Sequence, residues 1–183
     1  MKHLIPILIV AAGLASNAAA QEPPHISDAQ NNALYRRIYG QTEPQETSSP
    51  DHKLTAVYWQ THPGVYGQNV GAITIHDHDG RIIARNYLTD DGGRLVAVAH
   101  WSPDSRFCVF TTISAGGHSP WHFDPYVFSA SDLSFRSLND SVDAVIDPDF
   151  HFKSASTVYF TTREQITGLQ LQKGSTNPSN PRS

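Results

Sequence analysis

The stretch from Leu54 to Leu171 is a series of short runs that are rich in β-branched and aromatic residues. Gly, Pro and Asp separate these runs, which is the pattern of strands joined by turns. Asp79-Gly80 stands between two runs and is typical of a tight hairpin, because both residue types tolerate the positive φ angles that such turns require. The pattern predicts an all-β fold with strands at 54–60, 71–76, 82–87, 95–100, 107–113, 126–129, 135–138, 144–146, 157–162 and 166–171.

A repeated segment organises this stretch. The turn 101–107 (WSPDSRF) precedes the run 109–112 (VFTT), and the segment 147–150 (DPDF) precedes 158–162 (VYFTT). Residues 57–61 (VYWQT) form a third, weaker copy. In such a turn Pro fixes φ, Asp caps the turn with its own side chain, and Trp packs between neighbouring units. The repeat therefore predicts an antiparallel β-meander of similar units.

The segment Trp101-Ser102-Pro103-Asp104 resembles the strand-to-strand corner of TolB-type and WD40-like β-propeller blades, where Gly and a basic residue usually follow. Here Ser105 takes the place of that Gly. The resemblance implies propeller-like blade units, and it implies no activity. A closed ring takes about four to eight blades of ~40–45 residues, so this stretch is too short to close one. The resemblance implies either an incomplete propeller, whose edges an oligomer or the first helix covers, or a β-sandwich that shares the turn.

The first twenty residues have the pattern of a secretory signal peptide. Lys2 and His3 form a polar start, an apolar run follows at 4–15, and small residues at 18–20 end it. The run is shorter than the ~20 residues that a membrane-spanning helix needs. We expect cleavage after Ala20 and export to the periplasm or the medium of a bacterium, with no membrane span.

Residues 21–53 predict one short helix and a linker. The segment 27–30 (SDAQ) has the form of a capping box and Gly40 is a good residue to end a helix, so we expect the helix at 28–39. Residues 41–51 are rich in Pro, Ser and Thr, which is typical of a linker. A β domain is expected at 54–172, and the polar tail 173–183 is expected to be disordered.

Charge and cysteine content exclude some classes of partner and some kinds of stabilisation. The chain has 13 Lys and Arg against 17 Asp and Glu, so no basic surplus is available for binding nucleic acid. Cys108 is the only cysteine, so the chain forms no internal disulfide. Because Cys108 lies in an apolar run, we expect a small buried side chain rather than a nucleophile.

Two histidines precede the Asp79-Gly80 turn. On a strand, His76 and His78 share one face, so both imidazoles are placed to contact one metal ion. Asp77 and Asp79 share the other face. A catalytic zinc site needs a third protein ligand, and the neighbouring sequence offers none. The alternative is a solvated strand end that leads into the hairpin turn.

The connection at 114–123 is longer than the ~2–5 residues that usually join antiparallel strands, and such lengths are associated with binding loops. This segment is similar to exported bacterial proteins of unassigned function. The residues predicted for recognition are its two histidines and two aromatics: His118, Trp121, His122 and Phe123. The alternative is that the two aromatic side chains fold back over the sheet. The sequence leaves open whether the loop histidines meet the strand histidines in a four-ligand site.

No sequence motif indicates a particular enzymatic reaction. The chain has neither a Gly-x-Ser-x-Gly nucleophile elbow nor a Gly-Lys-Ser/Thr phosphate-binding loop. We therefore predict a non-enzymatic binding or interaction module of the bacterial envelope, without a cofactor, whose partner is an unidentified protein or small molecule. One alternative is a metal-dependent hydrolase that holds a divalent metal on His76 and His78, with a loop histidine as third ligand. The other is a structural subunit that completes a β-ring as a homo-oligomer.

Overall fold

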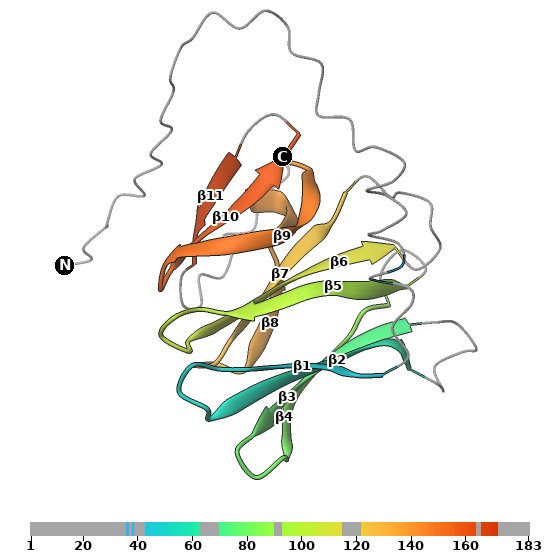
Figure 1. Ribbon diagram of the computed structural model, residues 1–183, viewed down its shortest axis with the longest axis vertical. Coiled ribbons are helices and arrows are strands. Elements are labelled where there is room, and N and C mark those ends of the chain that lie inside the picture. The colour runs from blue at the N-terminus through green and yellow to red at the C-terminus, as the bar shows by residue number, and fades with distance from the viewer. Residues whose placement is uncertain are drawn as a thin grey trace, which may run out of the picture.

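The fold is all-β, as the sequence predicts. The computed structural model describes residues 36, 38, 43–62, 70–89, 93–114, 122–163 and 166–171. Its strands form three antiparallel sheets, and in each sheet strands that are consecutive in the sequence lie side by side (Figure 1). The first sheet contains β1 (Gln45–Ser48), β2 (Leu54–His62), β3 (Val70–Asp77) and β4 (Ile82–Tyr87); the middle sheet contains β5 (Arg94–Trp101), β6 (Phe107–Ser114), β7 (Asp124–Ser129) and β8 (Ser134–Ser137); the third sheet contains β9 (Val145–Ser154), β10 (Thr157–Thr162) and β11 (Ile166–Gln170).

Two separate hydrophobic cores join the sheets, with the middle sheet between the other two (Figure 1). The core between the first and middle sheets includes Ile73, Ile75, Val96, Phe110 and Phe128. The core between the middle and third sheets includes Val109, Val127, Phe150, Val158 and Phe160. The middle sheet is thus covered on both faces, and every residue of β6 except Ser114 is buried. Cys108 on this strand is fully buried, as predicted, and burial raises the pKa of its thiol.

The third sheet has one buried face and one polar face. Along β10, partly exposed and buried residues alternate strictly from Thr157 to Thr162. On the outward face, the ring of His151 stacks on that of Tyr159 with centroids 5.5 Å apart. Lys153 Nζ donates a hydrogen bond to the Tyr159 hydroxyl at 3.2 Å. This face therefore ends the stack of sheets with side chains that favour water.

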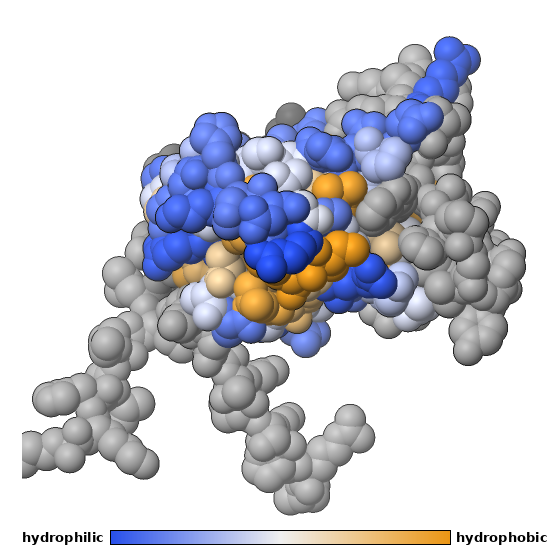
Figure 2. All heavy atoms as spheres, turned by 90° about the horizontal axis from the view of Figure 1, so that it is seen from below, coloured by the Kyte–Doolittle hydropathy of each residue, from blue (hydrophilic) through white to orange (hydrophobic). Residues whose placement is uncertain are grey.

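The outward side of the first sheet is mostly polar as well. The hydroxyls of Ser48 and Thr55 lie 3.3 Å apart, and the Arg85 guanidinium donates to the Tyr87 hydroxyl at 2.8 Å. Ile82 on β4 is an exception, with 45% of its surface exposed. Figure 2 views the molecule from this side and shows hydrophobic atoms bordered by hydrophilic ones.

The same turn joins β1 to β2 and β5 to β6, in residues 49–53 (SPDHK) and 102–106 (SPDSR). In both, the Ser hydroxyl donates to the Asp carboxylate at 2.8 Å and accepts the first N–H of the next strand at 3.0 Å. The fourth residue has a positive φ in both, 57° at His52 and 63° at Ser105. The basic fifth residue pairs with the carboxylate. In the first turn, the pKa of Asp51 is lowered to about 2. The hydrogen bond from the Ser49 hydroxyl contributes most, and the bond from the Lys53 N–H contributes next.

The second turn also holds the first turn in place. Trp101 Nε1 donates to the Thr47 carbonyl at 2.9 Å, and the Asp51 N–H donates to Ser105 Oγ at 3.0 Å. The Ser105 hydroxyl therefore makes a bond between the two turns that a glycine at this position could not make. These two bonds fix the first sheet against the middle sheet at the turn end.

The prediction of a linker at 41–51 is wrong. This segment contains β1, which pairs with β2 in a register that sets Thr47 opposite Ala56. The sheets therefore begin at Gln45 rather than at Leu54. An edge strand of this kind is held by its backbone hydrogen bonds, and hydrophobic periodicity does not report those bonds.

The prediction that residues 147–150 repeat the turn is also wrong, because they lie inside β9. In the pairing of β9 with β10, Phe150 lies opposite Phe160, and the next pair is Val145 opposite Thr162. β9 therefore has more residues than β10 between these two pairs, and the extra residues form a bulge. The bulge accommodates Pro148, which lacks an N–H for the ladder. The Thr111 hydroxyl donates to the Pro148 carbonyl at 2.8 Å. The second copy of the turn is instead the segment 49–53.

Two residues of the predicted helix 28–39 are described. Arg36 and Ile38 are helical, and Ile38 is fully buried in the core between the middle and third sheets. The other residues of the predicted helix 28–39, the predicted signal peptide 1–20 and the tail 173–183 lie outside the described residues. In the part of the chain that the structure describes, no helix has the length and apolar character to cross a membrane.

Candidate recognition surface

The short turns and the longer connections lie at opposite ends of the sheets. The β1–β2, β5–β6 and β9–β10 turns lie together on the left in Figure 1. In an antiparallel meander successive connections alternate between the two ends. β2, β4 and β6 therefore end at the other side, where the connections 63–69, 88–93 and 115–123 begin.

A charged network is buried at this second end, in the middle sheet. Arg94 opens β5, Asp124 opens β7, and the Arg94 guanidinium forms an ion pair with the Asp124 carboxylate. The side chains are 8% and 21% exposed. Arg94 Nε also donates to Thr112 Oγ1 at 2.9 Å, and this hydroxyl contacts the Asp124 carbonyl at 3.2 Å. A buried ion pair must satisfy its charges in this way, because both ions lose their hydration.

This network, called the Arg94 network below, holds both strands from which the connection 115–123 leaves. Thr112 lies near the end of β6 and Asp124 begins β7, and the two residues pair in the sheet register. Gly71 on β3 lies so close to the Arg94 carbonyl that any side chain there would collide with it. The base of the connection therefore lies where the middle sheet packs closely against the first sheet.

The residues predicted for recognition separate into three groups. His118 and Trp121 lie outside the described residues. His122 is exposed, next to the base of the connection. The prediction that Phe123 is a recognition residue is wrong, because its side chain is 1% exposed in the core and its N–H donates to the Val145 carbonyl at 2.9 Å. Phe123 instead anchors the end of the connection between the middle and third sheets.

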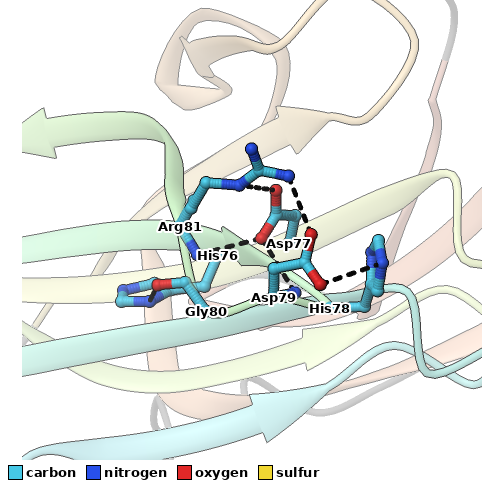
Figure 3. Close-up of polar contacts among 6 residues, drawn as sticks. All are labelled: His76, Asp77, His78, Asp79, Gly80 and Arg81. Carbon is cyan, nitrogen blue, oxygen red and sulfur yellow. Dashed lines mark hydrogen bonds and ion pairs between the residues drawn. The ribbon is translucent and has the colours of Figure 1, made fainter.

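The histidines of the β3–β4 hairpin do not meet. His76 Nε2 lies 2.8 Å from Thr74 Oγ1, and its Nδ1 lies 3.2 Å from the Gly80 carbonyl. His78 Nε2 lies 3.2 Å from Asp79 Oδ1. Figure 3 shows the two imidazoles on opposite sides of the Asp79–Gly80 segment. Residue 78 follows the end of β3, so the alternation of a strand does not apply to it.

The turn itself is a hairpin, as predicted, although its geometry differs from a two-residue turn. Only Gly80 has a positive φ, 78°, and the pairing of β3 with β4 contains a bulge after Ile75. A three-residue loop with Gly in the left-handed position has this form. The Asp77 carboxylate accepts hydrogen bonds from the Arg81 N–H and the Arg81 Nε, at 2.9 and 3.2 Å. The backbone bond from Arg81, first among these contacts, lowers the pKa of Asp77.

Metal ligands do not gather in the described residues. Among them, no group of three or more His, Cys, Asp or Glu side chains is arranged to hold a metal ion. Both ring nitrogens of His76 contact protein atoms, and a metal would have to displace one of these contacts. The hairpin is therefore a structural turn in this geometry.

Arg94 and Asp124 were not identified from the sequence. A signal was present, because Arg94 directly precedes the apolar run 95–99 (LVAVA) and Asp124 precedes Pro125 at the end of a long connection. Long charged residues are seldom buried without a partner, so a charged residue directly before a buried strand suggests an ion pair. The partner itself requires knowledge of the sheet register.

The comparisons with known proteins give no match: no protein-family model matches the chain, and no curated protein is similar to it.

Proposed function

We propose that the chain is an exported, non-enzymatic binding module of the bacterial envelope that recognises a protein or a small molecule through the connection 115–123. The observation that carries the proposal is the Arg94 network, which fixes both ends of this connection on the most buried sheet of the molecule. A binding loop on a rigid base loses less conformational entropy when it binds. The exposed His122 beside the buried Phe123 supports the proposal, because a polar side chain lies next to that base where a partner can reach it.

The proposal of export rests on the first twenty residues. A polar start, an apolar run and small residues before Gln21 are the features that signal peptidase reads. Expression in a bacterium should give a periplasmic or released product that begins at Gln21. Mass spectrometry of the intact product measures this directly, and an uncleaved protein in the membrane or the cytoplasm would refute export.

A matched pair of exposed histidines tests recognition. His122 lies at the long-connection end and His78 at the short-turn end, so a photo-crosslinking amino acid is placed at one position or the other in living cells. We expect a discrete cross-linked product from position 122 and none from position 78. Equal labelling at both positions would contradict the proposal.

Native mass spectrometry tests whether the partner is a small molecule. Protein purified without a tag should carry an additional mass, and the double variant Trp121→Ala with His122→Ala should lose it. His78→Ala should retain the additional mass, since this residue is remote from the connection in the fold. A ligand that survives the double variant would place the binding site elsewhere.

A further inference from the structure

Among the described residues, the third sheet has three strands where each of the other two sheets has four. In the first and middle sheets, the third strand along the meander is paired on both sides, β3 by β2 and β4, and β7 by β6 and β8. β11 occupies the same position in the third sheet and pairs only with β10 among the described residues. Figure 1 shows β11 at the outer edge of this sheet.

The backbone of β11 directs a set of hydrogen-bonding groups away from β10. The Leu171 N–H donates to the Ser156 carbonyl at 2.6 Å, so the backbone N–H and C=O of residue 171 are directed toward β10. Because this direction alternates along a strand, the backbone N–H and C=O groups of Gly168 and Gln170 are directed toward the open edge. After β10, the Arg163 N–H donates to the Ala144 carbonyl on the β9 side. Odd-numbered residues of β10 therefore direct their backbone groups toward β9 and even-numbered residues toward β11, which agrees with this alternation.

The last strands of the other two sheets, β4 and β8, carry features that oppose pairing with another chain, and β11 does not. β4 has Arg85 in its middle and a bulge in its pairing with β3, while β8 has only four residues, one of them Arg136. Charged side chains, bulges and short length are the usual protections of an edge strand. The sequence of β11 (ITGLQ) contains no charge and no Pro.

The fourth strands also cover the core between the first and middle sheets. Ile83 on β4 and Phe135 on β8 pack against the core between the first and middle sheets. In the third sheet, Leu169 of β11 is only partly buried against its core. The tail up to Ser183 is a poor substitute, because its sequence contains Pro178 and no large apolar residue after Leu171. An incoming strand with an apolar residue would complete this core.

We propose that the open edge of β11 pairs, antiparallel, with β11 of a second copy of this chain. A two-fold axis at Gly168 sets Thr167 opposite Leu169 of the other copy, and so brings a second leucine to the edge of the core. The strand has no charge, so two identical strands meet without repulsion. The two three-stranded sheets join into one continuous sheet, by the mode in which extended segments add to sheet edges.

Stacking of a second copy on the outer face of the third sheet is less favourable. It would remove Lys153 and His151 from water, at a high cost in hydration. On the first sheet, Ser48 occupies the turn position where Trp101 links the middle sheet to its neighbour. The edge of β11 is therefore favoured over these two outer faces for self-association, and it is independent of the connection 115–123.

Sedimentation of the purified mature chain over a range of concentrations tests the proposal. We expect twice the chain mass at high concentration and dissociation on dilution. Gln170→Pro removes an N–H that points to the open edge and leaves the bonds to β10 intact, so it should weaken the dimer by about ten- to a hundredfold, since two backbone bonds are lost per dimer. Gln170→Thr, which retains the N–H, should still dimerise.

Hydrogen exchange provides a second measurement that needs no variant. In the wild-type protein the Gly168 amide should exchange slowly at high concentration and rapidly on dilution, while amides of β6 should not change. A wild-type chain that remains monomeric, a Gln170→Pro variant that dimerises equally well, or a Gly168 amide that is insensitive to concentration would each overturn the proposal.

Discussion

The middle and third sheets contain nearly the same tetrapeptide in different surroundings. Residues 109–112 on β6 read VFTT, and residues 159–162 on β10 read YFTT. In β6 all four residues are buried, whereas in β10 burial alternates and Thr161 is partly exposed. The difference comes from position in the stack, since β6 has a sheet on each face and β10 has one on a single face.

The two environments make different demands on the same residue types. Thr111 is fully buried, and its hydroxyl has to find a protein acceptor, the Pro148 carbonyl on β9. Thr112 is also fully buried and joins the Arg94 network. On the third sheet, Tyr159 keeps its hydroxyl at the surface. A buried sheet therefore tolerates polar side chains only where a neighbouring strand or a neighbouring sheet supplies a partner.

The largest difference is expected from truncating one aromatic residue in each environment. Phe110 is fully buried between the first and middle sheets, so Phe110→Ala should lower the free energy of unfolding by about 3–5 kcal/mol. Tyr159 is partly exposed on the outward face, so Tyr159→Ala should cost less, roughly 1–2 kcal/mol, because it removes less buried area and leaves no internal cavity. Urea unfolding of both variants measures the contrast, and equal losses would mean that the outward face of the third sheet is covered.

A second contrast concerns charge. Arg94→Met leaves Asp124 buried without its partner and should cost about 3–5 kcal/mol. Arg85→Met on the first sheet removes a cation that contacts the exposed Tyr87, and should cost less than about 1 kcal/mol. A double variant, Arg94→Met with Asp124→Leu, should recover part of the loss because it removes both charges. If Arg94→Met is as mild as Arg85→Met in urea unfolding, the Arg94 network is not a rigid base for the connection 115–123.

Much of the architecture follows from residue patterns, and the failures have physical causes. The predicted strands at 82–87 and 157–162 match the structure, because both segments are rich in β-branched and aromatic residues, which favour strands. β1 escaped prediction because its stability comes from backbone pairing with β2 rather than from apolar side chains. Phe123 was assigned to recognition because residue type alone cannot separate an exposed aromatic from one that anchors a loop.

The repeat shows how one observation led to both a correct and a wrong inference. The string Ser-Pro-Asp followed by any residue and a basic one occurs at 49–53 and 102–106, and it encodes the same hydrogen bonds in both places. The segment 147–150 shares Pro and Asp but lacks the serine, whose hydroxyl accepts the first N–H of the next strand in the true turns. Matching the chemistry of the turn, rather than its order before an apolar run, identifies the true copy.

The smallest predicted effect separates these two turns from each other. His52 and Ser105 both have a positive φ, which costs a non-glycine residue about 1 kcal/mol. His52 is exposed, so His52→Gly should relieve this cost and raise the free energy of unfolding by up to about 1 kcal/mol. Ser105→Gly should give little or no gain, because it also removes the hydroxyl that accepts the Asp51 N–H between the sheets. Urea unfolding of the two variants tests this difference, and an equal gain in both would show that the bond from Asp51 to Ser105 adds nothing to the union of the first and middle sheets.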